Sequence, residues 1–465
     1  MKNALYAIVL LVSTSFAEDT YKAWFIDGKD VHKNKEKTHI DSLDEWFSEG
    51  SVHGNIRYYY IETKKESSSA HSNAIGGQLT YNTAHWNGFS LGSTFMTTNG
   101  FALPSKVDAS TIGRDNGVRL EDSSGGKIAQ DSFSALGEAY IEYHYKDLEL
   151  LYGRKVVKTP LIHAKDVRML PSAVQGGFFD YHVSDNISFG TSYLTHFKQR
   201  TSDRFINIIE HALGDRTEEI TGEGSGEVIT LNLNYTNDLL NVNVHNYYAQ
   251  DFLNSLYLET NYKFNVSSDL NYKLSAQYMN QMSIGNADTN LARAGSVTGG
   301  KEISSDFVGL KAKASYKESG FTLAYTKVFS SDSKHDSVVT PWDGTPLYTN
   351  TITSNNLFTS NYGKALSADS VYIGDSSGVK LAYSQKYDFT GIKGFSSSLS
   401  YLYIDNSRFE HNQKDYNAVI GYTKDTLQLL LKGIYVQNNT SASEDGTISS
   451  VDRFRQLRVI ANYKF

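Results

Sequence analysis

Lysines and arginines recur at alternate positions in segments whose other positions are apolar. Around Lys311 and Lys313, for example, positions 308, 310, 312 and 314 hold only Val, Leu or Ala. We expect such cations to face water, where they could attract carboxylates, because a Lys or Arg facing lipid at the membrane midplane costs roughly 2–4 kcal/mol. The same alternation selects Arg57, Lys311, Lys313, Lys380, Lys432 and Arg458.

Acidic residues follow the same alternation in an earlier segment. Outward-facing Ala139, Ile141 and Tyr143 would place Glu138 and Glu142 inside. The two signs are separated along the chain, so the interior would have an acidic side and a basic side that could orient a small zwitterion or carboxylate. The alternative is that these charges only keep the interior wet.

The sequence contains no pattern typical of catalysis or of a bound metal. Its 13 histidines show no HExxH spacing, and there is no cysteine to supply a thiolate ligand. Residues 222–226, Gly-Glu-Gly-Ser-Gly, lack the GxSxG spacing of a nucleophile elbow. We therefore expect no enzymatic activity, cofactor or metal.

The elements that position these charges must be strands between lipid and water, and the clearest is the last. One face holds Leu457, Val459, Ala461, Tyr463 and Phe465. The other holds Gln456, Arg458, Asn462 and Lys464, with Ile460 as an apolar exception. This alternation is typical of a transmembrane β-strand, although an edge strand of a soluble sheet would share it.

Alternation continues from about Ser51 to the end of the chain and predicts about eighteen strands. They are 51–63, 72–83, 88–97, 134–146, 147–157, 175–183, 186–198, 226–236, 239–250, 252–264, 268–282, 303–317, 320–330, 370–386, 394–405, 413–424, 426–439 and 453–465. Short and long connections alternate between them, except for a short one near Asp251. This predicts an all-β, transmembrane antiparallel β-barrel with short periplasmic turns. The last strand would close it by pairing with Val52–Tyr60, bringing Arg57 and Arg458 to the same stretch of inner wall.

The amino terminus predicts export. Lys2 precedes a short apolar run and then small residues at Ser15 and Ala17, so residues 1–17 read as a signal peptide. Residues 18–50 would be a periplasmic segment and 51–465 the barrel. The 32 Tyr and 23 Phe suit aromatic girdles at the membrane interfaces. A net charge of −7 gives no basic excess for nucleic acid.

One long connection differs from the others. After Gly153-Arg154-Lys155, residues 159–171 contain Asp166, Arg168 and an apolar Met-Leu pair between two prolines. An external loop has little use for that apolar cluster, whereas a loop folded into the barrel could pack it on the wall. Asp166 and Arg168 would then bond the wall or line the narrowed gap.

Several segments together resemble the OprD-type substrate-specific porins of Gram-negative, epsilon-type bacteria. They are 54–60 (GNIRYYY), 87–92 (NGFSLG), Gly153-Arg154 leading into 166–171 (DVRMLP), and 341–346 (PWDGTP). The resemblance implies an 18-stranded barrel whose inward-folded third and seventh loops form the constriction, with a ladder of basic residues guiding carboxylates. By position it selects Arg57, Arg154, Lys155, Asp166, Arg168 and Arg458. Several ladder positions hold Lys, which lacks the bidentate fork of Arg.

These patterns predict an outer-membrane porin for passive, charge-selective diffusion of small solutes such as carboxylates, amino acids or ions. The alternative is an adhesin or structural barrel whose long loops, 98–133, 199–225 and 331–369, bind an external partner. The expected partners are solutes, outer-membrane lipid and lipopolysaccharide, and the barrel-assembly machinery through Phe465. The protein would be either a monomer or a homotrimer.

Overall fold

The computed structural model describes most of the chain as antiparallel strands. The described residues are 40–64, 69–100, 120–121, 127–128, 132–164, 167–213, 226–293, 302–331, 336–350, 374–406, 411–438 and 452–465. The signal peptide expected at 1–17 and most of the segment expected at 18–50 lie outside these residues, so both stay predictions.

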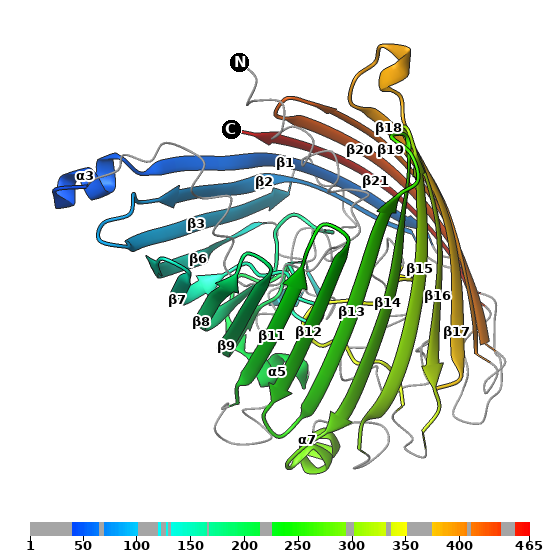
Figure 1. The fold of residues 1–465 in the computed structure, drawn as a ribbon, viewed down its shortest axis with the longest axis horizontal. Coiled ribbons are helices and arrows are strands. Elements are labelled where there is room, and N and C mark those ends of the chain that lie inside the picture. Colours follow the sequence, from blue (N-terminus) through cyan, green and yellow to red (C-terminus); the bar gives the residue numbers. More distant parts are fainter. Residues whose placement is uncertain are drawn as a thin grey trace.

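Eighteen strands form one closed barrel (Figure 1). Each pairs antiparallel with the strands next to it along the barrel, and the first pairs with the last. The strands are β1 (Ser51–Lys64), β2 (Ser69–Asn82), β3 (Phe89–Gly100), β6 (Ser132–Tyr145), β7 (Leu148–Lys155), β8 (Ala173–Ser184), β9 (Ile187–Lys198), β11 (Val228–Thr236), β12 (Leu240–Ala249), β13 (Leu253–Asn265), β14 (Leu270–Ser283), β15 (Ser304–Tyr316), β16 (Ser319–Phe329), β17 (Ser376–Lys386), β18 (Phe395–Asn406), β19 (His411–Lys424), β20 (Leu427–Asn438) and β21 (Asp452–Lys464). The predicted barrel of about eighteen strands is confirmed.

The alternation within each strand gives the barrel an apolar outer face. In β16, Phe321 and Leu323 are 56% and 52% exposed, whereas Ala324 on the opposite face is 1% exposed. Exposed Leu, Ile, Val, Phe and Tyr side chains recur in this way around the barrel. An apolar band with alternating inward polar residues suits a wall between lipid and water.

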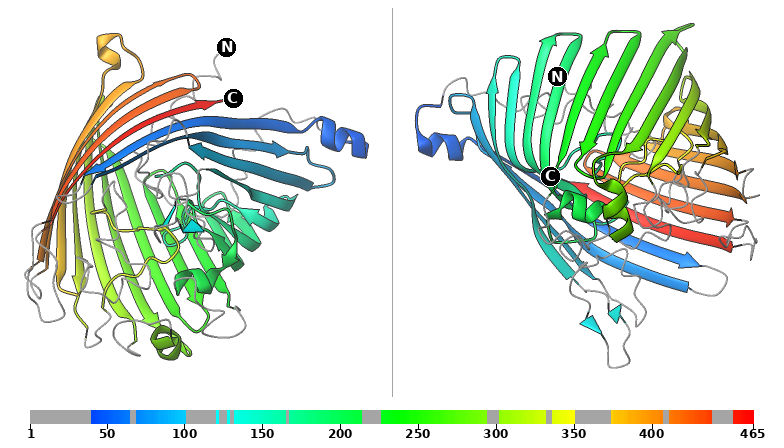
Figure 2. Two further views of the ribbon diagram at one scale, coloured as in Figure 1. Left: turned by 180° about the vertical axis from the view of Figure 1, so that it is seen from behind. Right: turned by 90° about the horizontal axis from the view of Figure 1, so that it is seen from below.

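The barrel closes where β1 pairs with β21, so blue and red strands lie side by side in Figures 1 and 2. The paired residues are 55–64 and 455–464, a register displaced toward Lys64 from the expected Val52–Tyr60. Arg57 therefore lies opposite Asn462, and Arg458 opposite Ile61. The two arginines share a wall but are not direct partners.

Short connections gather at the end of the barrel where β1 begins and β21 ends. Several need a positive φ, which Asn87, Lys146, Lys317 and Asp425 adopt at 50° to 54°. In another, the Asn237 side-chain oxygen accepts hydrogen bonds from the backbone N–H groups of Leu239 and Leu240, at 3.0 and 2.7 Å. Because short turns are periplasmic in such barrels, we assign this end to the periplasm.

Several short elements are not among the eighteen strands of the wall and were not predicted. They are β4 (Leu120–Glu121), β5 (Lys127–Ile128), β10 (Ile206–Asn207), α3 (Leu43–Ser48), α5 (Ile208–Ala212), α7 (Ala287–Arg293) and η1 (Asp388–Thr390). One of them, β10, pairs with the end of β9. Helix α3 packs at the periplasmic end, where the Trp46 indole N–H donates to the Phe89 carbonyl at 3.2 Å. Across the ranges described, no helix is long and apolar enough to cross a membrane.

Candidate functional site

The connection after β7 folds onto the inner wall. Met169 and Leu170 are buried in a cluster with Tyr59 and Ile61 of β1, which belong to the inward face of that strand. The Tyr59 hydroxyl also donates to the Val167 carbonyl at 3.0 Å. The apolar Met-Leu pair therefore packs on the wall inside the barrel.

Residues 336–350 of the connection after β16 also pack inside, on the inner side of the green strands (Figure 2). The Gln281 side chain of β14 donates to the Val339 carbonyl and accepts from the Val339 N–H, both at 2.8 Å. Trp342 is fully buried, and its indole N–H donates to the Ile208 carbonyl of α5 at 3.0 Å.

These two segments join each other, and we call residues 157–164, 167–172 and 336–350 together the inner bridge. The Gly344 N–H donates to the Leu161 carbonyl at 2.9 Å, and the His163 N–H to the Trp342 carbonyl at 3.1 Å. A Cβ on Gly344 would lie only 2.2 Å from the Pro160 carbonyl oxygen. Glycine therefore permits the close approach of the two backbones.

Asp343 connects the inner bridge to the segment that follows β9. Its carboxylate accepts a 2.5 Å hydrogen bond from the Ser172 hydroxyl and forms an ion pair with Arg200. Nearby in α5, the pKa of His211 is lowered to about 4, mainly by burial; the negative charge of Asp343 opposes this shift and the positive charge of Arg200 adds to it. Three segments distant in sequence thus share one polar cluster.

Lys311 and Lys380 support the inner bridge from the wall. The Lys311 ammonium lies 4.0 Å from the centre of the Tyr348 ring, and the Lys380 ammonium donates to the Asn350 carbonyl at 2.7 Å. The Tyr348 hydroxyl in turn donates to Glu259 of β13 at 2.8 Å. Both predicted lysines face inward and contact the bridge.

Three inward lysines form a row across β13, β14 and β15. Lys263 is the direct cross-strand partner of Lys273, and Lys273 of Lys313. Each keeps at least part of its surface exposed. Like charges directly opposite one another destabilise a sheet, so this row favours a bound anion. We call it the lysine row.

Sequence reasoning found Lys313 but missed Lys263 and Lys273. Extending the inward alternation of Glu259 and Asn261 to the end of the strand would have found Lys263. The three side chains are neighbours because of the register in which the strands pair, and this register cannot be derived from the alternation within each strand.

Near the barrel seam, the predicted cations differ in their exposure. Arg458 is fully buried and donates to Gln456 at 2.5 Å, and Arg57 is 5% exposed with its guanidinium carbon 5.4 Å from the Tyr59 ring centre. Lys432, the direct partner of Arg458 on β20, is partly exposed. Of these three, Lys432 is the best placed to meet a solute.

Acidic residues occupy the inner face of β6, β7 and β8. Glu138 accepts from the Val156 N–H at 3.0 Å and lies 3.7 Å from the Lys155 ammonium. Glu142 is buried further along the same face. Glu149 and Asp180, which sequence reasoning missed, are buried cross-strand partners on β7 and β8.

The remaining predicted residues lie apart from this arrangement. Arg154 was expected inside, but it lies on the outward face of β7 with Tyr152, which is 69% exposed. There its guanidinium donates to Gln175 at 3.0 Å and lies 4.3 Å from the Phe205 ring centre. Arg168 donates to the Val167 carbonyl at 2.9 Å, and Asp166 lies outside the described residues.

No group of three or more His, Cys, Asp or Glu side chains within the described ranges could hold a metal ion. The charged groups of the interior are instead spread over separate strands. Such an arrangement can attract and orient a charged solute.

Residues 44–465 match the model of the family described as outer membrane porin, OprD family. A search of curated proteins gave no match.

Solved structures share the fold at low sequence identity. OccAB1 of Acinetobacter baumannii has a TM-score of 0.69 at 13% identity, covering 91% of this chain and 99% of its own. OpdK of Pseudomonas aeruginosa, crystallised with vanillate, has a TM-score of 0.67 at 14% identity, with coverage of 90% and 99%. OccK9 (OpdG) of the same species has 0.68 at 14%, with 90% and 100%.

Proposed function

We propose which solutes pass through this chain, which belongs to the OprD family of outer-membrane porins and so forms a substrate-specific outer-membrane channel. They are small carboxylate-bearing solutes, which cross by charge-selective diffusion. The lysine row carries this proposal. Lys263, Lys273 and Lys313 place adjacent ammonium groups on the inner wall, where a carboxylate would relieve their repulsion. The vanillate bound by OpdK is a solute of this chemical class.

The acidic wall supports a second class of solute. Glu142, Glu149 and Asp180 lie on β6 to β8, whereas the lysine row lies on β13 to β15 and Lys432 on β20. A solute with both a carboxylate and an ammonium group could therefore be oriented between the two walls. Amino acids have this charge pattern.

The test measures ion selectivity in planar bilayers. Replacing all three residues of the lysine row with Gln should shift the reversal potential in a KCl gradient toward cation preference and slow carboxylate uptake in liposome-swelling assays. The matched control replaces Lys414, Arg453 and Arg455 with Gln, which removes as much positive charge from the outer face.

Equal shifts in the two triple variants would show that the lysine row does not select the solute. The absence of discrete conductance steps at high protein concentration would contradict the channel itself. That result would revive the adhesin or structural-barrel alternative, which family membership does not favour.

Residues at the two ends of the chain bear on how the barrel reaches the membrane. We infer that residues 1–17 direct export and that the barrel-assembly machinery recognises Phe465. Deleting Phe465 should lower the amount of assembled barrel, read as the heat-modifiable band on gels, whereas replacing Phe465 with Tyr should not.

A further inference from the structure

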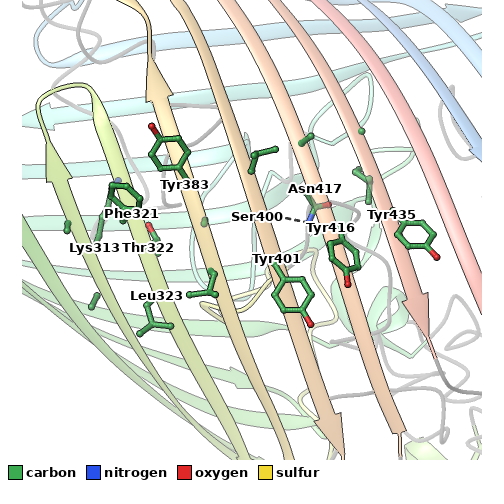
Figure 3. Close-up of a pocket in the computed structure, with 18 of the residues that line it drawn as sticks. Lys313, Phe321, Thr322, Leu323, Tyr383, Ser400, Tyr401, Tyr416, Asn417 and Tyr435 are labelled. Atoms are coloured by element: carbon green, nitrogen blue, oxygen red, sulfur yellow. Dashed lines mark hydrogen bonds between the residues drawn. The ribbon is translucent and has the colours of Figure 1, made fainter.

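A groove of about 1120 Å³ crosses the outer face of the barrel (Figure 3). Outward side chains line it, including Leu323, Leu381 and Leu399, which are 52%, 51% and 59% exposed. Its lining includes no described residue of the inner bridge. Lys313 of the lysine row borders it, although that side chain belongs to the inward face of β15. The groove faces the membrane.

Small residues form the floor of the groove. Ala418 and Gly433 are direct cross-strand partners on β19 and β20. A Cβ on Gly433 would meet no atom closer than 4.0 Å, so neither packing nor backbone conformation requires glycine there. Glycine within a strand weakens the sheet and often marks a place where a ligand approaches closely.

Aromatic residues form one side of the groove. The ring centres of Tyr401 and Tyr416 lie 5.0 Å apart, and those of Tyr416 and Tyr435 lie 5.9 Å apart. Figure 3 shows these three tyrosines on neighbouring strands. Flat rings over a floor of small side chains leave room for an extended hydrocarbon chain.

Cations continue the tyrosine row toward the extracellular end. Arg455 is the direct partner of Tyr435, and its guanidinium carbon lies 5.7 Å from that ring centre. Arg453 and Lys414 are both cross-strand partners of Gln437, which is the next outward-facing residue of β20 after Tyr435. All three cations lie on the outward face, close to the long connection between β20 and β21.

Two acidic residues in the described part of this face, Glu62 and Asp405, each have a partner on the protein. Glu62 pairs with Lys64 at 2.8 Å, and the Asp405 carboxylate accepts from the Tyr403 hydroxyl at 3.3 Å. Three cations at the end of an apolar groove therefore match an anionic headgroup joined to an acyl chain.

We propose that this groove is a specific site for a phosphorylated, acylated glycolipid of the extracellular leaflet. One acyl chain would lie over Ala418 and Gly433 beside the tyrosines. The phosphate would lie among Lys414, Arg453 and Arg455. The site binds one lipid in a fixed place on the barrel, which goes beyond general solvation by the membrane.

Native mass spectrometry of the detergent-solubilised full-length protein with added lipid A tests this site. The triple variant Lys414→Gln, Arg453→Gln, Arg455→Gln should lose at least tenfold in retained lipid A, as should Gly433→Leu, whose side chain fills the groove. Ala276→Leu, an outward substitution on β14, is the control and should bind as wild type. Lipid A lacking its phosphates should bind the wild type weakly.

The proposal would be overturned if the triple variant and Gly433→Leu both retained as much lipid A as the wild type. It would also be overturned by a dimer of the wild type that Gly433→Leu abolishes, because the groove would then be covered by a second copy of the chain. Retained bilayer conductance shows that each variant still folds, so a loss of lipid can be assigned to the site.

Discussion

Adjacent residues of a β-strand point to opposite faces of the barrel wall, so two neighbouring cations can meet different surroundings. The resemblance to a family put both Arg154 and Lys155 inside, which a regular strand does not allow. Lys155 faces inward beside Glu138, and Arg154 faces outward beside Gln175. Alternation within this sequence placed Lys380 correctly on the inner face, so the local pattern was the better guide.

Substitution of Asp343 tests how much this one side chain contributes to the stability of the inner bridge. Asp343→Asn keeps a side chain that tolerates the positive φ of 65° but loses the charge that binds Arg200 and Ser172. Losing charge-assisted hydrogen bonds costs about 1.5–3 kcal/mol, so local opening should become roughly 10- to 100-fold more frequent. Faster trypsin cleavage at Arg200 or Arg204 would reveal it.

The barrel of the Asp343→Asn variant should keep its resistance to heat and detergent, because the strand pairing is unchanged. Ser172→Ala, which removes one neutral donor, is the control and should have a smaller effect. Equal protease resistance in all three proteins would contradict the role given to Asp343.

His211 makes the same region sensitive to acid. In the folded protein the pKa of His211 is about 4, below the ordinary value of 6.5. The neutral His211 ring therefore contributes fully to the stability of this region above pH 6.5, and this contribution is lost as the pH falls toward 4. Because the residue keeps a small exposed surface that water screens, we expect a loss of about 1–2 kcal/mol. Hydrogen exchange of residues 199–213 should therefore accelerate between pH 7 and 4.5, after correction for the intrinsic rate.

His211→Phe should abolish that acceleration, because Phe retains the ring contact with Phe197 at 4.5 Å between centres but does not titrate. An unchanged pH dependence in this variant would assign the effect to another group.

Among the secondary-structure elements, the strands of the barrel wall could be predicted from the sequence better than the segments that pack inside the barrel. Period-two alternation located the eighteen strands, and the apolar Met169-Leu170 pair predicted an inward-folded loop. The junction of Ile162 with Trp342 could not be predicted, because it depends on two distant connections meeting inside a closed barrel. The short α5 helix lies in a connection without alternation, and its contact with Trp342 was equally invisible.

Gly344→Ala tests that junction. The added methyl would meet the Pro160 carbonyl, and relieving such a contact typically costs about 1–3 kcal/mol. We expect the two halves of the inner bridge to separate, giving a larger single-channel conductance and weaker selectivity. Gly177→Ala is the control, since its Cβ would find its nearest neighbour at 3.9 Å. Equal conductance in both variants would mean that the bridge does not limit the channel.

For the whole molecule, fixed charges on the lumen wall make selectivity depend on salt. The Debye length is about 10 Å at 0.1 M and about 3 Å at 1 M ionic strength, so the lysine row and the acidic wall should act on passing ions only in dilute salt. Reversal potentials under equal concentration ratios should approach those of free diffusion at 1 M KCl. Selectivity that persists at 1 M would indicate direct binding at a narrow point instead.

The pairing of β1 with β21 also sets an order of events in biogenesis. The Gln456 side chain donates to the Thr63 hydroxyl at 3.0 Å across 393 residues of sequence. Until the final strand has been synthesised and delivered, the first strand has no partner on one edge, and an unpaired edge invites aggregation. The amino-terminal half therefore cannot complete its fold while the ribosome is still at work. We expect the exported part of the chain to be held unfolded until its carboxyl end arrives, so the chaperones that bind it would be needed until the last strand has been delivered.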